Sequence, residues 1–337
     1  MRIDPLFRAL SDPTRLRIMR LLAHMELAVG ELAQVLGQSQ PRVSRHVRIL
    51  CDAGLAERRK EGSWVFLRSA IGEDSAPPLG AAAARLLTLA ERDDAGFAAR
   101  CGEDRRHLAA IRAAREASAQ AYFARHADQW DTLRSLHSAD GPVEAALAEA
   151  LQGEGKSGSL GALLDVGTGT GRMAELFAAR ANRVTALDKS PEMLRIARAR
   201  LQALPSDKID LVQGDFTALP FAEAAFDTVL FHQVLHYAQA PETVLGEAAR
   251  VTREGGRIAV VDFAAHDREE LRSAHAHARL GFSDEQMLAL LSEAGFAANP
   301  PVALVGKPLT VKIWTGRRQR GPAPLRKDAA TGEVAHP

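Results

Sequence analysis

The chain has 337 residues, of which 46% are hydrophobic and 25% charged, the proportions of an ordinary globular protein long enough for two domains. Its two cysteines exclude a disulfide-stapled domain and a zinc site built mainly on thiolates. No apolar run approaches the length of a membrane-spanning helix, and the N-terminus lacks an apolar signal core. We therefore expect a cytoplasmic protein.

The net charge of +1 is unevenly distributed. Residues 1–70 hold 12 Lys or Arg against 7 Asp or Glu, a net charge of +5, whereas residues 160–320 hold 19 of each kind. Nucleic acids are held largely by such positive charge. The first 70 residues are therefore the part of the chain where we expect contact with a polyanion.

Composition and periodicity divide the chain into four predicted parts. Residues 1–70 combine short helical patterns with a hairpin pattern, and residues 71–117 begin as a linker and continue as an Ala- and Arg-rich helical segment. Residues 118–316 form the second domain, where strand and helix patterns alternate from residue 161 onward, which is typical of a parallel α/β sheet. Residues 317–337 contain little that is apolar, so we expect a flexible tail.

The first part has the element order of a winged helix-turn-helix. Helices are predicted over residues 12–24, 29–36 and 40–52. Gly37 ends the second of these helices and begins a tight turn. Alternating apolar residues on both sides of Lys60-Glu61-Gly62 predict a β-hairpin, the wing. In such folds the helix after the turn enters the major groove of DNA.

The third predicted helix has a basic face opposite its apolar face. Val43, Val47 and Leu50 fall on one side, whereas Arg45 and Arg48 fall on the other. Arg, Gln and Ser side chains can bond base edges or phosphates, and basic residues of a wing can bind the DNA backbone. The predicted DNA-binding residues are Gln38, Ser39, Gln40, Arg42, Ser44, Arg45, His46, Arg58, Arg59 and Lys60.

These residues also carry a family resemblance. The stretches ALSDPTRLRIMRLL and ELAVGELAQVLGQSQPRVSRHVRILCDAGLAERRKEGSWVFLR resemble the ArsR/SmtB family of bacterial regulators over residues 3–68. The resemblance implies a homodimer that binds double-stranded operator DNA. Ala28 and Gly30 stand where arsenic-sensing members have cysteines, and the paired Asp and His of zinc-sensing members are missing after the wing. We therefore expect no metal site.

A glycine-rich turn opens the predicted α/β sheet. The sequence GALLDVGTGTG places an apolar strand before Gly167, Gly169 and Gly171, and a helical pattern follows. Glycines let the backbone turn tightly and approach a ligand closely. The dinucleotide pattern G-x-G-x-x-G would need glycine at position 172, where Arg172 stands, so the spacing argues against NAD.

Polar residues recur at the C-terminal ends of the predicted strands that follow. Asp188 ends the second strand, Asp215 and Phe216 follow the third, His232 follows the fourth, and Asp262 ends the fifth. Open α/β sheets bind their ligands at this edge. Asp188 is suited to accept from ribose hydroxyls, and Asp215 from the exocyclic amine of an adenine beside Phe216.

The same region resembles the class I S-adenosylmethionine-dependent methyltransferases, in particular the ubiquinone-biosynthesis-like group that acts on small molecules. LLDVGTGTG, ALDKSPEML, QGDFTALPF and EAARVTREGGRIAVVDF carry the resemblance over about residues 118–316. It implies a Rossmann-like sheet of seven strands, an N-terminal helix that covers the cofactor, and S-adenosyl-L-methionine or S-adenosyl-L-homocysteine as the ligand. The predicted cofactor-binding residues are Asp165, Gly167, Gly169, Gly171, Asp188, Lys189, Asp215, Phe216 and His232.

Methyl transfer from a sulfonium needs alignment and in some enzymes a base, because the methyl group is already activated. The candidate catalytic residues are His232, His236 and Asp262. The expected fold class is α/β: a mostly helical winged helix-turn-helix domain, followed by a Rossmann-like methyltransferase domain.

Two functional hypotheses remain open at this stage. In the first, the chain is a transcription regulator whose second domain binds the cofactor and either senses it or methylates a small molecule. In the second, the chain is an active small-molecule methyltransferase whose first domain serves mainly dimerisation or feedback on its own pathway. The sequence identifies neither the methyl acceptor nor the operator, and it leaves turnover undecided.

Overall fold

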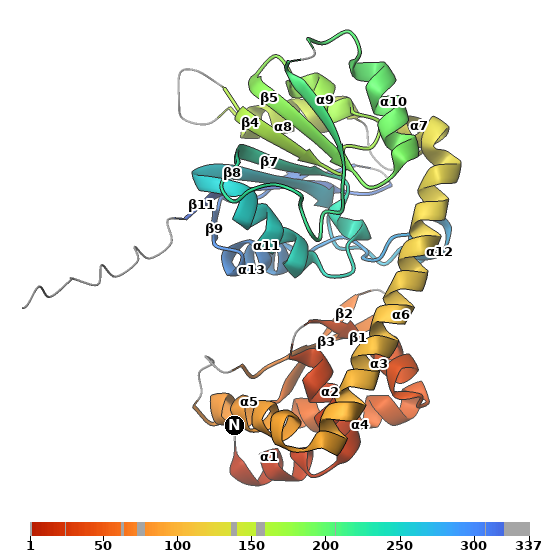
Figure 1. Ribbon diagram of the computed structural model, residues 1–337, viewed down its shortest axis with the longest axis vertical. Helices are drawn as coiled ribbons and strands as arrows, with labels where there is room; N and C mark the ends of the chain where they lie inside the picture. Colours follow the sequence, from red (N-terminus) through yellow and green to blue (C-terminus); the bar gives the residue numbers. More distant parts are fainter. Residues whose placement is uncertain are drawn as a thin grey trace, which may run out of the picture.

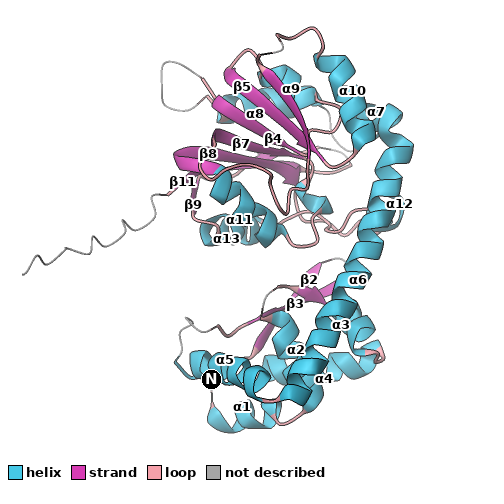
Figure 2. Cartoon of the chain, in the orientation of Figure 1, coloured by secondary structure: helices cyan, strands magenta, loops and turns pink. Residues whose placement is uncertain are grey.

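Two domains lie at opposite ends of a long helix in the computed structural model of the chain (Figure 1). Helices dominate the N-terminal domain, whereas a large sheet between helices forms the C-terminal domain (Figure 2). The structure describes residues 2–23, 25–61, 64–72, 78–135, 140–152, 159–205, 207–306 and 308–319.

The N-terminal domain is a winged helix-turn-helix, as predicted. The Asp12 carboxylate caps α2 by accepting from the backbone N–H of Arg15, and Pro13 occupies the first turn of that helix. Gly37 ends α3 at φ +62°, a left-handed conformation that turns the chain toward α4. Three antiparallel strands form a small sheet in the order β1-β3-β2. The elements are α1 Ile3–Leu10, α2 Pro13–Leu22, β1 Leu27–Ala28, α3 Val29–Leu36, α4 Gln40–Asp52, β2 Ala56–Glu61 and β3 Trp64–Ser69.

Two helices follow the hairpin, α5 (Pro78–Asp93) and α6 (Ala95–His126). The Asp94 carboxylate caps α6 by accepting from the backbone N–H of Phe97 at 2.9 Å. The helix continues past residue 117, so the predicted boundary between residues 117 and 118 lies within a helix. Leu108 of α6 is buried in the core of the N-terminal domain.

The C-terminal domain is built on a sheet with the strand order β10-β11-β8-β7-β4-β5-β6. Its central strands are parallel, and β11 pairs antiparallel with both β8 and β10. These seven strands confirm the predicted Rossmann-like sheet, and β9 is a short eighth strand beside β11 that the sequence did not predict. The strands are β4 Gly161–Val166, β5 Ala181–Asp188, β6 Ile209–Gln213, β7 Phe226–His232, β8 Thr252–Phe263, β9 Phe296–Ala298, β10 Val302–Leu304 and β11 Val311–Arg318.

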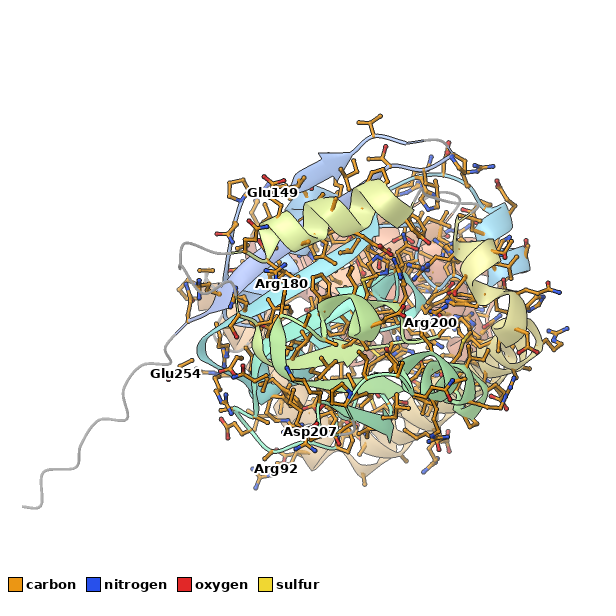
Figure 3. The ribbon with its side chains drawn as sticks, turned by 90° about the horizontal axis from the view of Figure 1, so that it is seen from above. Arg92, Glu149, Arg180, Arg200, Asp207 and Glu254 are labelled. Carbon is orange, nitrogen blue, oxygen red and sulfur yellow. The ribbon has the colours of Figure 1, made fainter. Side chains whose placement is uncertain are left out.

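Helices cover both faces of this sheet. Alternate residues of β4 point to opposite faces, so Leu163 packs in one apolar layer and Leu164 in the other. Figure 3 looks down on this domain and shows Arg180 near Glu149 of α8, where the Arg180 guanidinium donates to the carbonyl oxygen of Ala148 at 3.0 Å. The helices are η1 Ala127–Gln129, α7 Trp130–Ser135, α8 Asp140–Ala150, α9 Arg172–Phe177, α10 Pro191–Leu201, η2 Leu235–Tyr237, α11 Pro241–Val251, α12 Glu270–His275 and α13 Asp284–Glu293.

The predicted tail over residues 317–337 lies outside the described residues from residue 320 onward, and strand β11 extends to Arg318. Among the described helices, none combines the length and the apolar character needed to cross a bilayer.

Candidate functional site

A cavity that is open to solvent lies at the C-terminal ends of β4, β5 and β7, and its empty space, with the solvent at its mouth included, is about 990 Å³. This is the edge at which open α/β sheets bind ligands. The second half of α6 forms part of its wall through Glu116, Ala119, Gln120 and Phe123. The cavity is thus enclosed by the sheet of the C-terminal domain and by the helix that the two domains share.

The glycine-rich loop after β4 is a preformed cradle. Gly167, Gly169 and Gly171 have φ of +68°, +54° and +84°, which L side chains rarely adopt. A Cβ atom on Gly167 would lie 2.3 Å from Cγ2 of Val234. The backbone N–H of Gly169 donates to Oδ2 of Asp188 at 2.8 Å, which ties the loop to the end of β5. The predicted glycines therefore shape the cavity wall.

Two carboxyl groups lie at this loop, that of the buried Asp165 and that of the half-buried Asp188. Asp165 is 1% exposed, and its Oδ2 accepts from the Thr168 hydroxyl at 2.6 Å. Burial, with the nearby charge of Asp188 as a smaller cause, raises the pKa of Asp165 to about 6. Burial also raises the pKa of Asp188, which accepts from the backbone N–H of Ser190 at 2.9 Å. Hydroxyl donors or a positive charge in the cavity would favour the ionised forms of both groups.

Of the residues predicted near an adenine, Phe216 and Lys189 line the cavity, but Asp215 lies outside the lining. The Asp215 carboxylate accepts from Lys189 Nζ at 2.7 Å and from the backbone N–H of Thr217 at 2.8 Å. Lys189 Nζ also donates to Glu116 of α6 at 2.9 Å. In this arrangement Asp215 positions Lys189 rather than facing a ligand.

The end of β7 brings His232 and Gln233 to the cavity. Burial lowers the pKa of His232 to about 3, with the charge of Arg134 as a further cause, so the imidazole is neutral. Its Nε2 is buried without a hydrogen-bond partner among the described residues. Gln233 has φ +53°, a strained conformation for a non-glycine residue that is frequent at functional sites.

Of the other two candidate catalytic residues, His236 lies at a second, smaller cavity that shares Trp130 and Arg134 with the first, and Asp262 lies outside the lining of both. His236 lines this cavity, and its Nδ1 lies 2.7 Å from Oδ1 of Asp262. The two side chains are 2% and 0% exposed. The structure thus brings His236 and Asp262 together and places His232 in the larger cavity.

Several lining residues were not among the predicted site residues: Glu116, Gln120, Phe123, Trp130, Arg134 and Tyr237. The aromatic cluster of Tyr122, Phe123 and Trp130 was the available signal, because the sequence predicts a covering helix there. Phe123 and Trp130 do face the larger cavity, whereas Tyr122 lines the smaller one, with its hydroxyl oxygen 2.9 Å from Nδ1 of His275. The helical spacing of these aromatic residues alone did not show which of them would face the larger cavity and which the smaller one.

The basic face of α4 is exposed as predicted, opposite the buried Val43, Val47 and Leu50. Its exposed side chains are Gln40, Arg42, Ser44, Arg45 and Arg48, and Ser39, Arg58 and Lys60 are also exposed. Two other predicted contacts are half-buried. Gln38 Nε2 donates to the Thr14 hydroxyl at 3.3 Å, and His46 Nδ1 lies 3.7 Å from Asp12. These two side chains connect the turn before α4, and α4 itself, to the start of α2.

Arg59 departs from its predicted role as a phosphate contact. Its guanidinium donates to Glu26 at 3.0 Å and to Glu61 at 2.9 Å, and it lies over the ring of Phe66. Arg279 of the C-terminal domain, 1% exposed, donates to the same Glu26 at 2.8 Å. Arg59 is therefore part of a partly buried charge cluster between the domains.

The end of the wing is held by the C-terminal domain. Glu61, the last residue of β2, is 5% exposed. Its Oε1 accepts from Arg272 at 2.7 Å and from the backbone N–H of Leu280 at 2.8 Å. The Arg272 guanidinium also lies over the ring of Trp64, 4.4 Å from its centroid. The wing is accordingly bound to the segment that includes α12.

Comparison with known families assigns both domains. Residues 12–58 match the family model described as bacterial regulatory protein, arsR family, and residues 164–260 match the model of a methyltransferase domain. The chain therefore joins an arsR-family helix-turn-helix domain to a methyltransferase domain.

Curated relatives match the second of these domains. The demethylmenaquinone methyltransferase of Renibacterium salmoninarum is 32% identical over 152 residues, which cover 45% of this chain and 59% of that protein. The phosphatidylethanolamine N-methyltransferase of Cereibacter sphaeroides is 37% identical over 112 residues, 33% of this chain and 55% of that protein. The chain thus spans less than two thirds of these relatives, whose names point to different acceptors.

Among solved structures, the N-methyltransferase NodS from Bradyrhizobium japonicum in complex with S-adenosyl-L-homocysteine has a TM-score of 0.45 and 21% identity. The match covers 54% of this chain and 90% of that one.

Proposed function

We propose that this chain is a transcription regulator that binds operator DNA through α4 and the wing, and that its methyltransferase domain binds S-adenosylmethionine or S-adenosylhomocysteine. Occupancy of the large cavity then changes the affinity for DNA. The observation that carries this proposal is α6, because one helix belongs to the core of the DNA-binding domain and to the wall of the ligand cavity.

Specific contacts fix both halves of α6. Toward the N-terminus of α6, the Asp104 carboxylate accepts from Arg17 of α2 at 2.7 Å, and just past its middle Arg115 donates to Glu31 of α3 at 2.7 Å. In the second half, Glu116 accepts from Lys189 beside the ligand cavity. A ligand that moves the second half of α6 therefore acts directly on a helix packed against α2 and α3.

The cavity fits the proposed ligand. Gly167 leaves no room for a side chain, and Gly169 has a φ of +54° that disfavours one, so the backbone of this loop can approach a ligand closely. Asp188 is placed to accept from ribose hydroxyls, Phe216 to stack on a base, and the carboxyl of Asp165 to favour a cation. When bound, S-adenosylmethionine supplies an activated methyl group.

We also propose that the regulator is a homodimer. Ile3 and Phe7 of α1 and Leu86 and Leu89 of α5 are at least half exposed, although they are large and apolar. Both helices lie at the same end of the N-terminal domain (Figure 1). Apolar side chains gathered on one surface are typical of a protein–protein contact.

The test is the affinity of the full-length protein for an operator fragment at fixed salt, measured with S-adenosylmethionine and then S-adenosylhomocysteine. A ligand shifts this equilibrium only by its difference in affinity for the two states, so a tenfold shift corresponds to about 1.4 kcal/mol of coupling. We expect a shift of at least that size with one of the ligands. Unchanged DNA affinity in a protein that binds both ligands by calorimetry contradicts the sensor role.

Two variants control this experiment. Arg45→Ala should weaken DNA binding and reduce the slope of its salt dependence by about 1, without affecting ligand binding. Asp188→Ala should weaken ligand binding by tenfold or more, because it removes a charged acceptor worth about 1.5–3 kcal/mol, and leave DNA binding without ligand unchanged.

A second candidate function is turnover of a small-molecule acceptor. The buried pair of His236 and Asp262 favours it, because cofactor sensing alone needs no imidazole with a free nitrogen beside the cavity.

A further inference from the structure

An open groove lies in the N-terminal domain between α4, the wing and the first turn of α3, and we call it the wing groove. Its empty space, with the solvent at its mouth included, is about 1110 Å³. Three of the predicted DNA-binding residues line it, Gln40 and Ser44 of α4 and Arg58 of β2. In a helix-turn-helix the first helix crosses the DNA backbone while the second lies in the major groove. The wing groove is thus on the side of the domain where a DNA strand would pass.

The lining of the wing groove is positively charged. Arg48 and Arg58 line it as exposed side chains, and Arg115 of α6 lines it as well. Glu31 is the acidic residue among the described lining residues, so three positive charges stand against one negative charge. Phosphate groups of nucleic acids are held by such charge. Arg115 was not among the predicted contacts, because it lies in the helix that joins the domains.

A buried carboxylate holds the Arg115 side chain in place. Oε1 of Glu31 accepts from Nη1 of Arg115 at 2.7 Å, and Oε2 accepts from the backbone N–H of Ala28 at 2.9 Å. Glu31 is 5% exposed, whereas 35% of the Arg115 side chain is exposed. The groove therefore presents the guanidinium, and not the carboxylate, to an incoming phosphate.

The Arg115 guanidinium has more donors than this ion pair uses, because a guanidinium carries five N–H groups in one plane. Nη1 donates to Glu31, and Nη2 lies 3.5 Å from Oε1 of Gln34, at the limit of a hydrogen bond. Cζ of Arg115 lies 5.6 Å from the centroid of the Trp64 ring on the wing. These contacts orient the plane of the guanidinium, and a fixed plane favours charge-assisted hydrogen bonds to phosphate oxygens.

We propose that one strand of a DNA duplex lies in the wing groove and that Arg115 binds one of its phosphates. This inference rests on the proposed binding of DNA by the N-terminal domain. The next residue of α6, Glu116, accepts from Lys189 beside the ligand cavity at 2.9 Å. Neighbouring residues of one helix then contact the DNA and the cavity wall, so the shared helix carries a DNA contact of its own.

The test is the salt dependence of DNA binding by the full-length protein. We would follow the fluorescence anisotropy of a labelled duplex of random sequence, about 30 base pairs long, between about 50 and 200 mM NaCl, since phosphate contacts need no particular sequence. For each phosphate contact, the logarithm of the affinity falls by about 0.9 per tenfold rise in salt. Arg115→Gln should therefore reduce the slope by about 1 and weaken binding about eightfold at 0.1 M salt.

The matched control is Arg106→Gln, which removes the same charge from an exposed position of α6 outside the wing groove. It should keep the slope of the wild type. A wild-type slope in Arg115→Gln protein that is folded by circular dichroism overturns the proposal, as does an equal loss of slope in Arg106→Gln.

Variants of the ion pair separate a phosphate contact from a structural role of Arg115. Arg115→Lys should recover most of the slope, because it retains a positive charge. Glu31→Gln breaks the same ion pair but keeps the guanidinium, so it should reduce the slope less than Arg115→Gln does. Equal losses in Arg115→Gln and Glu31→Gln would indicate a structural role and overturn the proposal. If Arg115→Gln does not fold, the double variant with Glu31→Gln replaces it, since no buried charge is then left unpaired.

The same measurements distinguish this inference from the proposed function. Wild-type protein that fails to bind the duplex at about 50 mM NaCl removes the DNA-binding function and this contact with it. Wild-type binding with equal slopes in Arg115→Gln and the wild type removes only the contact of Arg115.

Discussion

The two domains are connected in two places that differ in kind. Helix α6 is continuous backbone, and its hydrogen bonds follow a local rule that fixes the distance and angle between its two halves. The wing contact is made by charged side chains from distant parts of the sequence, Glu26 and Glu61 with Arg272 and Arg279. The helix is the route by which we propose that a movement of the cavity wall reaches the DNA-binding domain, whereas the wing contact consists of side chains alone.

The energetics of buried ion pairs sharpen this difference. Removing one partner of such a pair costs about 3–5 kcal/mol, because it leaves an uncompensated charge out of water. Substitution of one charged partner should therefore destabilise the whole wing contact. Because Glu61 ends β2, the contact with the C-terminal domain buries the end of the wing that we propose to contact DNA.

The largest effect is expected from Glu61→Gln. The change removes the charge that Arg272 and Arg59 share, so the closed wing should lose about 3 kcal/mol. Hydrogen exchange of the β2–β3 amides should become faster, and DNA affinity should lose its response to ligand. The matched control is Glu57→Gln on the same strand, whose partner Arg68 is largely exposed, with a cost below about 1 kcal/mol. Equal exchange rates in the two variants would show that the contact between Glu61 and the C-terminal domain does not stabilise the wing in solution.

Ala117→Pro tests the other connection. Residue 117 is exposed within α6, so the effect of proline comes from the backbone: one lost hydrogen bond and a steric clash, about 3 kcal/mol. We expect ligand binding and DNA binding to persist separately while their coupling disappears. The control, Ala117→Gly, should cost about 1 kcal/mol and retain the coupling. Coupling that survives proline would assign the signal to the wing contact alone.

Gly167→Ala should leave both connections between the domains intact and prevent ligand binding. The added Cβ atom meets Val234, and φ of +68° costs an L residue about 1–2 kcal/mol. Calorimetry should show no ligand binding, and DNA affinity should equal that of ligand-free wild type. Gly246→Ala, in α11 with nothing within 4 Å of the new atom, should instead stabilise the protein by about 1 kcal/mol. Wild-type ligand affinity in Gly167→Ala would move the binding site away from this loop.

The smallest effect is expected from Glu116→Gln, which weakens the ion pair between α6 and Lys189. Both side chains are more than a third exposed, so unfolding in urea should change by less than about 1 kcal/mol. The ligand response of DNA binding should nevertheless decrease, because this pair joins α6 to the cavity wall. If the effect of ligand on DNA affinity is unchanged, the packing of Phe123 of α6 against the cavity, and not the ion pair, would connect ligand binding to the helix.

Local rules explain which features the sequence predicted. Gly37 and the apolar spacing of α4 define a helix-turn-helix within a few residues, and the glycines after β4 are required by backbone conformation. Asp188 followed from the rule that ligands bind at strand ends. Each of these inferences uses residues that are close in sequence or ordered by the parallel sheet.

Pairings between distant residues explain the departures. Arg59 has the sequence context of a phosphate contact, and only the fold shows that its guanidinium donates to Glu26, an acceptor that it shares with Arg279. Asp215 follows the end of a strand like the other acids, but its carboxylate forms an ion pair with Lys189, which lies nearby in the fold. The extent of α6 was hidden because the helix packs on different partners along its length, so no single apolar stripe runs through it.

The shared helix also limits how the length of this protein can change. One residue inserted between Ile111 and Ala119 would rotate the second domain by about 100° and move it about 1.5 Å along the helix axis. Seven residues, nearly two turns, would restore the orientation to within about 20° but add about 10 Å, and Arg272 would no longer reach Glu61. A homologue that keeps both connections must therefore keep the length of this stretch, even where none of its exposed side chains is retained.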